Sequence, residues 1–182
     1  WRSAGSCAKT VDDRVVGPGF VPQIQERFKS EALYVVCSDV GGVVRAGARA
    51  NRLNANLAII DMRREKAGES EVMNVIGEVE GKVCILVDDI VDSGGTLCNA
   101  AGALMENKAK EVHAYVVHGV LSGTAVEKVE KSPLKKLVIT DSIVATDEVA
   151  NARKIEQISV ASLMGEALRR INEERSISAL FK

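Results

Sequence analysis

VCILVDDIVDSGGTL, residues 83–97, joins a buried strand to a polar turn and the start of a helix. Residues 83–90 are mostly apolar, and an unbroken apolar run is typical of a strand covered on both faces of a sheet. Two adjacent carboxylates, Asp88 and Asp89, lie near the end of this run, and a third acid precedes a Ser-Gly-Gly-Thr turn. The following residues predict a helix over about 96–107, so acidic side chains are expected where the strand gives way to the helix.

The rest of the chain continues this succession of strands and helices. Further strands are predicted over residues 32–39, 56–61, 111–120, 136–143 and 155–161, with residues 71–79 as an extended arm. Helices are predicted over residues 22–30, 43–53, 124–131 and 161–174. Because helices separate apolar strands, we expect an α/β fold with a mostly parallel sheet covered by helices on both faces. We expect residues 1–10 to form an N-terminal arm of unknown role and residues 11–182 to form a single domain.

Charge and hydropathy argue against several classes of protein. The 182 residues include 24 basic and 25 acidic side chains, and this net charge of -1 argues against general binding to nucleic acids or membrane surfaces. No apolar run is long enough to predict a transmembrane helix, and the first residues lack a signal-peptide pattern. No Cys-x-x-Cys pair indicates a zinc site, and Cys37 and Cys84 are expected to be buried thiols in a reducing compartment. We therefore expect a cytoplasmic protein.

The polar turn has the features of a phosphate-binding site. It consists of Asp92, Ser93, Gly94, Gly95 and Thr96. Backbone N–H groups in the first turn of a helix lack intrahelical acceptors, and the positive end of the helix dipole lies there. The two glycines let the backbone approach a ligand closely, and the hydroxyl groups add donors. The alternative is that Asp92 or Ser93 only caps the helix while the glycines only turn the chain.

The paired acids Asp88 and Asp89 favour the ligand-binding alternative. Carboxylates do not bind phosphate, but two adjacent ones can accept hydrogen bonds from a vicinal diol or help to hold Mg²⁺. A nucleotide P-loop would place a lysine after the glycines, and a dinucleotide-binding turn would read Gly-x-Gly-x-x-Gly; this turn has neither pattern. A phosphate turn beside paired acids therefore indicates a sugar phosphate as the ligand.

These residues closely resemble the phosphoribosyl-diphosphate binding motif of type I phosphoribosyltransferases and of ribose-phosphate diphosphokinases. The shared pattern is an apolar run, two acids, two apolar residues, an acid, a small residue, a glycine-rich turn and a threonine. The resemblance implies that Asp92–Thr96 hold the 5-phosphate of a phosphorylated ribose. It also implies that Asp88 and Asp89 face the ribose hydroxyl groups.

Other stretches resemble the ribose-phosphate diphosphokinases in particular. CSDVGGVVRAGARA, residues 37–50, is similar to their diphosphoryl-binding loop, with Cys-Ser in place of the usual Ser-Pro. This similarity implies that Asp39, Gly41 and Gly42 bind diphosphate and that Asp39 binds Mg²⁺. Similarity continues through residues 61–82, 118–143 and 176–181, so that it covers about residues 11–182.

The resemblance implies an enzyme that moves the diphosphoryl group of ATP onto the 1-hydroxyl of ribose 5-phosphate, with Mg²⁺, for nucleotide biosynthesis. It also implies a homo-oligomer or an association with other family members. The family chain is nearly twice as long, and its N-terminal half supplies much of the ATP site. We therefore expect the ATP site to be incomplete in this chain.

The catalytic loop departs from the family pattern at one position. The family has Lys-Arg-Arg, in which the lysine and the second arginine stabilise the transferring phosphoryl group, whereas this chain has Met62-Arg63-Arg64. Arg64 is thus the expected catalytic residue, while Met62 carries no charge. We expect the chain to bind ribose 5-phosphate but to catalyse poorly. The alternatives are a non-catalytic regulatory or oligomerisation domain of the same family, or a phosphoribosyltransferase, for which no base-recognition segment is found.

Several other polar residues have simpler explanations. His113 and His118 flank an apolar strand without a partner at metal-ligand spacing, so packing or capping roles are expected. The lysine-rich run 128–136 is expected to be a solvated face rather than a nucleic-acid patch. Asp141 and Ser142 follow a predicted strand, where they could line the pocket; Asp141 could equally cap the next turn.

Overall fold

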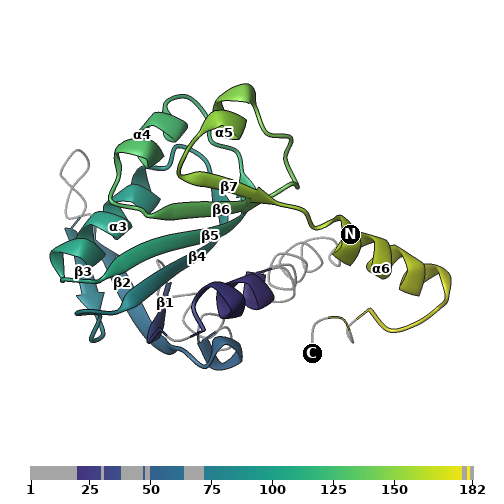
Figure 1. Ribbon diagram of the computed structural model, residues 1–182, viewed down its shortest axis with the longest axis horizontal. Helices are drawn as coiled ribbons and strands as arrows, with labels where there is room; N and C mark the ends of the chain where they lie inside the picture. The colour runs from purple at the N-terminus through teal and green to yellow at the C-terminus, as the bar shows by residue number, and fades with distance from the viewer. Residues whose placement is uncertain are drawn as a thin grey trace.

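A seven-stranded sheet organises the residues that the computed structural model describes, which are 20–29, 31–37, 47, 50–63, 72–177 and 180 (Figure 1). The order across the sheet is β3-β2-β1-β4-β5-β6-β7. The strands are β1 (Leu33–Cys37), β2 (Asn56–Arg63), β3 (Val72–Ile76), β4 (Val83–Val91), β5 (Glu111–Gly119), β6 (Lys136–Thr140) and β7 (Ile155–Ile158). Every neighbouring pair is parallel except β2 and β3, so the predicted α/β fold with a mostly parallel sheet is confirmed.

Helices lie on both faces of this sheet. The labelled helices are α3 (Gly95–Glu106), α4 (Ala125–Lys131), α5 (Asp147–Asn151) and α6 (Ala161–Asn172). In Figure 1, α3, α4 and α5 lie on one face, the helical residues 20–27 lie on the other, and α6 extends away from the sheet. None of the residues of α6 is buried. Within the described ranges, no helix combines the length and apolar character that a membrane crossing requires.

The burial of β4 explains why this strand reads as an unbroken apolar run. Side chains alternate across a strand, so Cys84 and Leu86 pack in the layer that contains α3 and α4. Ile85 and Val87 point to the opposite layer, where they join the helical residues Phe20 and Ile24. Both faces of the strand are therefore apolar, as expected for the centre of a parallel sheet.

The strand predicted over residues 136–143 ends earlier, because side chains redirect the backbone after Thr140. The hydroxyl of Thr140 accepts a hydrogen bond from the Ser142 backbone N–H at 3.2 Å. It also donates to the Val117 carbonyl at 2.7 Å. Local bonds of this kind compete with the hydrogen bonds of a sheet.

Two further elements differ from the sequence prediction. Residues 72–76 form an antiparallel edge strand rather than an arm, and pair from Ile59 opposite Ile76 to Arg63 opposite Val72. Helix α5 was not predicted, since five residues are too few to show helical periodicity. Its start is fixed by the Thr146 hydroxyl, which accepts a hydrogen bond from the Val149 N–H at 3.3 Å.

His113 in β5 has the packing role that its position predicted. The ring is only 4% exposed and lies edge-on to Phe28, with ring centroids 4.8 Å apart. Its Nε2 lies 3.1 Å from a carboxylate oxygen of Glu111. Burial lowers the pKa of His113, and the hydrogen bond to Glu111 opposes this shift, while the nearby charges of Arg27 and Lys135 add to it.

We expect this histidine to make stability depend on pH. In the unfolded chain His113 takes up a proton near its ordinary pKa of about 6.5, whereas the folded chain resists protonation until a lower pH. Its contribution to the free energy of unfolding should be constant above about pH 7 and should fall on acidification, by up to about 1.4 kcal/mol per pH unit. Urea unfolding of the wild type and of His113→Leu between about pH 5 and pH 8 measures this. The wild type should lose stability relative to the variant at low pH; a difference that does not change with pH would contradict the assignment.

Candidate functional site

The paired acids lie at the edge where the parallel strands end. The last β1–β4 pair is Val36 opposite Leu86, so Asp88 and Asp89 extend beyond β1. On the other side, Asp88 lies opposite Val116 of β5. The carboxyl ends of strands in open α/β sheets are where ligands bind, because the loops diverge there. The structure therefore places Asp88 and Asp89, the carboxylates predicted to face a diol, at the carboxyl ends of the parallel strands.

One oxygen of the Asp88 carboxylate is oriented by the strand itself. The Asp89 backbone N–H donates a hydrogen bond to Asp88 Oδ1 at 2.8 Å. The Asp88 side chain is half-buried, while Asp89 is exposed. The side chain of Asp88 is therefore more restricted in its orientation than the side chain of Asp89.

The glycine turn starts α3 without a side-chain cap. Gly94 is the N-cap residue, in the left-handed region with φ 72°. A glycine adopts this conformation without the steric penalty that a side chain brings. The N-terminus of α3 receives no side-chain hydrogen bond from its cap residue, and its first turn contains no acidic residue. The alternative that Asp92 or Ser93 caps this helix is therefore wrong, and the N–H groups of its first turn suit an external anion.

A pocket of about 280 Å³ opens at this turn. It is lined by Asp88 and by residues 90–97, which include all five residues of the predicted phosphate turn. This volume is close to the lower end of the range for small-ligand pockets, roughly 300–1,000 Å³. The structure thus brings Asp88 and the predicted phosphate turn into one hollow, while Asp89 is exposed beside it.

Asp92 is tied to the connection between β5 and α4. Its Oδ1 accepts a hydrogen bond from the Ser122 hydroxyl, and its backbone carbonyl accepts one from the Ser122 N–H at 3.1 Å. These two hydrogen bonds hold Asp92, the first residue of the turn, against the segment that precedes α4. Ser122 is 30 residues away along the chain, and the sequence contained no signal for this contact.

The other predicted site residues, Asp39, Gly41, Gly42 and Arg64, lie outside the described residues, as do residues 1–10. The described strands β1 and β2 precede Asp39 and Arg64 in the chain, and their last residues show where these two segments begin. β1 ends at Cys37, which lies opposite Ile59 of β2, and β2 continues from there to Arg63. Because β1, β2 and β4 are mutually parallel, both strands end at the edge that carries the pocket.

The described part of the site contains oxygen donors that could contact a magnesium ion. No group of three or more His, Cys, Asp or Glu side chains within the described ranges could hold a metal ion. Mg²⁺ commonly binds one or two carboxylates and completes its shell with water and substrate phosphates. The carboxylates of Asp88 and Asp89 are oxygen donors of the type that this ion prefers.

Asp141 connects two segments at the same edge of the sheet. Its Oδ1 accepts a hydrogen bond from the Val160 N–H at 2.9 Å, just before α6. Hydrogen bonds from Ser159 and Val160 lower the pKa of Asp141. These bonds tie the carboxylate to the segment before α6 and not to the turn that directly follows β6, which the capping alternative required. His118 Nδ1 lies 2.9 Å from the Ser142 hydroxyl, a contact that ties β5 to the turn after β6.

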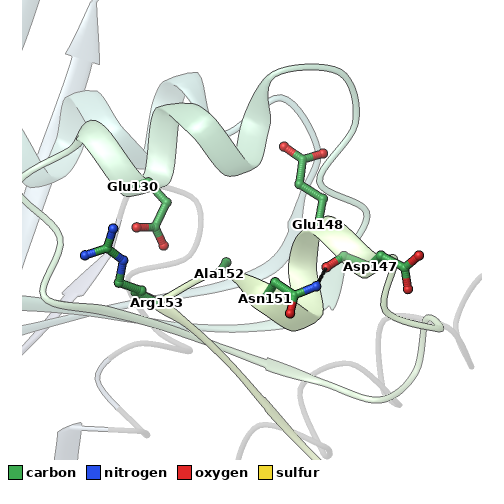
Figure 2. A pocket seen from close by; sticks show the side chains of 6 residues that line it. All are labelled: Glu130, Asp147, Glu148, Asn151, Ala152 and Arg153. Carbon is green, nitrogen blue, oxygen red and sulfur yellow. Dashed lines mark hydrogen bonds between the residues drawn. The ribbon is translucent and has the colours of Figure 1, made fainter.

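A second hollow lies between α4, α5 and the residues that lead into β7 (Figure 2). It is lined by Glu130, Asp147, Glu148, Asn151, Ala152 and Arg153. Its polar groups already serve the fold: Glu130 accepts a hydrogen bond from the Lys154 N–H at 2.7 Å, and Asn151 donates to the Asp147 carbonyl at 2.7 Å. The hollow adjoins the amino end of β7, where parallel strands rarely bind ligands. The pocket at the glycine turn is therefore the better candidate.

Sequence comparison relates this chain to longer proteins. Residues 62–182 match the family described as the phosphoribosyl synthetase-associated domain. A ribose-phosphate pyrophosphokinase of Granulibacter bethesdensis is 56% identical over 171 residues, which are 94% of this chain and 55% of the relative. One of Rhizobium meliloti is 58% identical over 164 residues, 90% of this chain and 53% of the relative. The chain spans about half the length of the curated relatives it matches.

Solved structures agree with the sequence matches. The crystal structure of a phosphoribosylpyrophosphate synthetase from Mycobacterium smegmatis is similar with a TM-score of 0.79 and 30% identity, over 87% of this chain and 51% of that one. A hypoxanthine phosphoribosyltransferase from Staphylococcus aureus is similar with a TM-score of 0.50 and 13% identity, over 82% of this chain and 73% of that one. The second likeness concerns the fold alone.

Proposed function

Because the chain belongs to the phosphoribosyl synthetase-associated domain family, we propose that it is the ribose 5-phosphate-binding part of a ribose-phosphate pyrophosphokinase, also called a ribose-phosphate diphosphokinase. The observation that carries the proposal is the uncapped N-terminus of α3 beside the paired acids of β4. An anion suits the helix N-terminus, and a vicinal diol suits two adjacent carboxylates. Ribose 5-phosphate contains both groups.

In this proposal the two ends of the sugar phosphate contact different parts of the pocket. Backbone N–H groups of the first turn of α3 and the hydroxyls of Ser93 and Thr96 donate hydrogen bonds to the 5-phosphate. Asp88 and Asp89 accept hydrogen bonds from the ribose diol. Fixing both ends holds the 1-hydroxyl in one orientation, which lowers the entropic part of the barrier to its attack on ATP.

The remaining roles in the proposed reaction belong to residues outside the described ranges. We assign diphosphate binding to Asp39, Gly41 and Gly42, a metal contact to Asp39, and stabilisation of the transferring group to Arg64. Mg²⁺, when bound, would neutralise charge on the diphosphoryl group. We further propose that the protein acts in the cytoplasm, in an oligomer or with other family members, and that ATP binding needs residues beyond this chain.

A second candidate is a non-catalytic domain that regulates or assembles family members. Met62 favours it, because an uncharged side chain stands where the family pattern has a lysine. Size-exclusion chromatography of the chain, alone and mixed with a catalytic relative, tests whether the chain joins an assembly of family members or stays an isolated fragment. A regulatory domain should move into the larger complex and change the turnover of its partner.

The binding proposal predicts a clear order of affinities in calorimetry. Ribose 5-phosphate should bind at one site per chain, and ribose should bind at least about 10-fold more weakly, since charge-assisted hydrogen bonds contribute about 1.5–3 kcal/mol each. ATP titrated with Mg²⁺ should bind more weakly than ribose 5-phosphate. Equal affinity for ribose and ribose 5-phosphate, or no binding of either, would sink the proposal.

A further inference from the structure

Helix α4 packs directly behind the phosphate turn. A Cβ atom placed on Gly94 would lie 3.6 Å from the Ala125 carbonyl oxygen and 3.8 Å from a methyl carbon of Val129. Both neighbours belong to α4. A side chain at Gly94 would therefore meet α4, so this helix, which lies some 30 residues later in the chain, is close to the turn.

The segment that leads into α4 is bonded to the residues just before the glycines. The Val91 carbonyl accepts hydrogen bonds from the N–H groups of Val120 and Leu121, at 3.0 and 3.1 Å. Asp92 is bound by the backbone and side chain of Ser122. Residues 120–122 thus hold the start of the turn, and a group on α4 contacts the next residue, Ser93.

Lys128 of α4 supplies that group. Its ammonium donates a hydrogen bond to the Ser93 carbonyl oxygen at 3.3 Å. The two halves of a trans peptide point in opposite directions, so the Gly94 N–H lies on the side away from the lysine. A cation on the carbonyl polarises the peptide and makes this N–H a stronger donor.

The charge of Lys128 also matters for an anion. The described residues that line the pocket include two carboxylates, Asp88 and Asp92, and no basic side chain. A phosphate entering this hollow is repelled by both acids, and Lys128 places a positive charge against the back of the turn. Its carbonyl contact distinguishes it from Lys131 on the same helix, whose ammonium is 2.5 Å from the Glu127 carboxylate.

We infer that Lys128 is a positioning residue of the phosphate turn, which orders the Ser93–Gly94 peptide and offsets the negative charge of the pocket. This assignment rests on the proposed function in that the anion is taken to be the 5-phosphate of ribose 5-phosphate. The ordering of the turn by Lys128 is independent of which ligand binds.

The test compares Lys128→Met with Lys131→Met, which removes the same charge from the same helix. At low ionic strength Lys128→Met should weaken ribose 5-phosphate binding about 10-fold, and near 1 M salt, where the Debye length is about 3 Å, the deficit should shrink to about 3-fold or less. Lys128→Arg should recover most of the affinity, and Lys131→Met should bind as the wild type does. Equal affinities for the two methionine variants at every salt concentration would overturn the assignment.

Hydrogen exchange without ligand provides the second measurement. The backbone amides of residues 93–96 should exchange at least about 3-fold faster in Lys128→Met than in Lys131→Met, since the turn has lost a tether. Equal exchange in the two variants would overturn the positioning role. Should the wild type fail to bind ribose 5-phosphate, the proposed function fails, and the exchange rates still decide whether Lys128 orders the turn.

Discussion

Replacing Met62 by lysine should raise the turnover of an assembled enzyme by about 10² to 10⁵-fold, because phosphoryl transfer depends on positioned positive charge. The expectation applies to a chimera in which this chain is joined to the half of the Granulibacter bethesdensis relative that lies outside the match. Met62 lies opposite Met73 in the β2–β3 pair, at the edge of the sheet that carries the pocket. A lysine there would restore the Lys-Arg-Arg pattern of the family loop.

The measurement is a coupled assay of AMP formation from ATP and ribose 5-phosphate. Met62→Leu is the matched control, because it changes the side chain at the same position without adding charge, and it should leave turnover low. A chimera with Met62 that already turns over as fast as the Granulibacter relative would contradict the expectation. It would show that the remaining charges of the loop suffice.

Replacing both paired acids, as Asp88→Asn with Asp89→Asn, should weaken ribose 5-phosphate binding about 100-fold. Each carboxylate is expected to accept a charge-assisted hydrogen bond from the ribose diol, and about 1.4 kcal/mol lost at each site corresponds to this factor. The asparagines nearly keep the size of the side chains, so the effect reports charge and hydrogen bonding rather than packing.

For inorganic phosphate, the same double variant is not expected to lose affinity. Phosphate has no diol to lose, and the removal of two negative charges near the turn reduces its repulsion, so its affinity should stay level or rise. Calorimetry with both ligands measures the contrast. Glu80→Gln with Glu106→Gln removes two charges from exposed positions outside the pocket and should leave both affinities unchanged. A parallel loss of phosphate and ribose 5-phosphate affinity would contradict the diol assignment for Asp88 and Asp89.

The sequence alone predicted the parallel strands of the sheet and the location of the pocket. Apolar runs such as Val83–Val87 specify buried parallel strands, because both faces of such a strand must be apolar. The acids after this run and the glycines of the turn are local signals as well, since a left-handed residue such as Gly94 is a property of the backbone at that position. Each of these features depends on neighbours in the chain, which a single sequence displays.

Only the tertiary structure decided what holds the turn in place. Ser122 contacts Asp92 across 30 residues, and Lys128 contacts Ser93 across 35. The lysine-rich run that contains Lys128 was predicted to be a solvated face, and this lysine is exposed, yet it bonds to Ser93 of the phosphate turn. Asp141 likewise accepts a hydrogen bond from Val160, 19 residues away, although the sequence left the role of this carboxylate open.

These contacts share one physical cause. The parallel register of β4 and β5, with Val91 opposite Gly119, brings the segment after β5 against the segment after β4. Register is set by the packing of whole strands and by the length of the crossover between them, not by the residues that finally meet. The sequence therefore predicts which residues bind a sugar phosphate, whereas the contacts of Ser122 and Lys128 with the turn follow from the packing of whole elements.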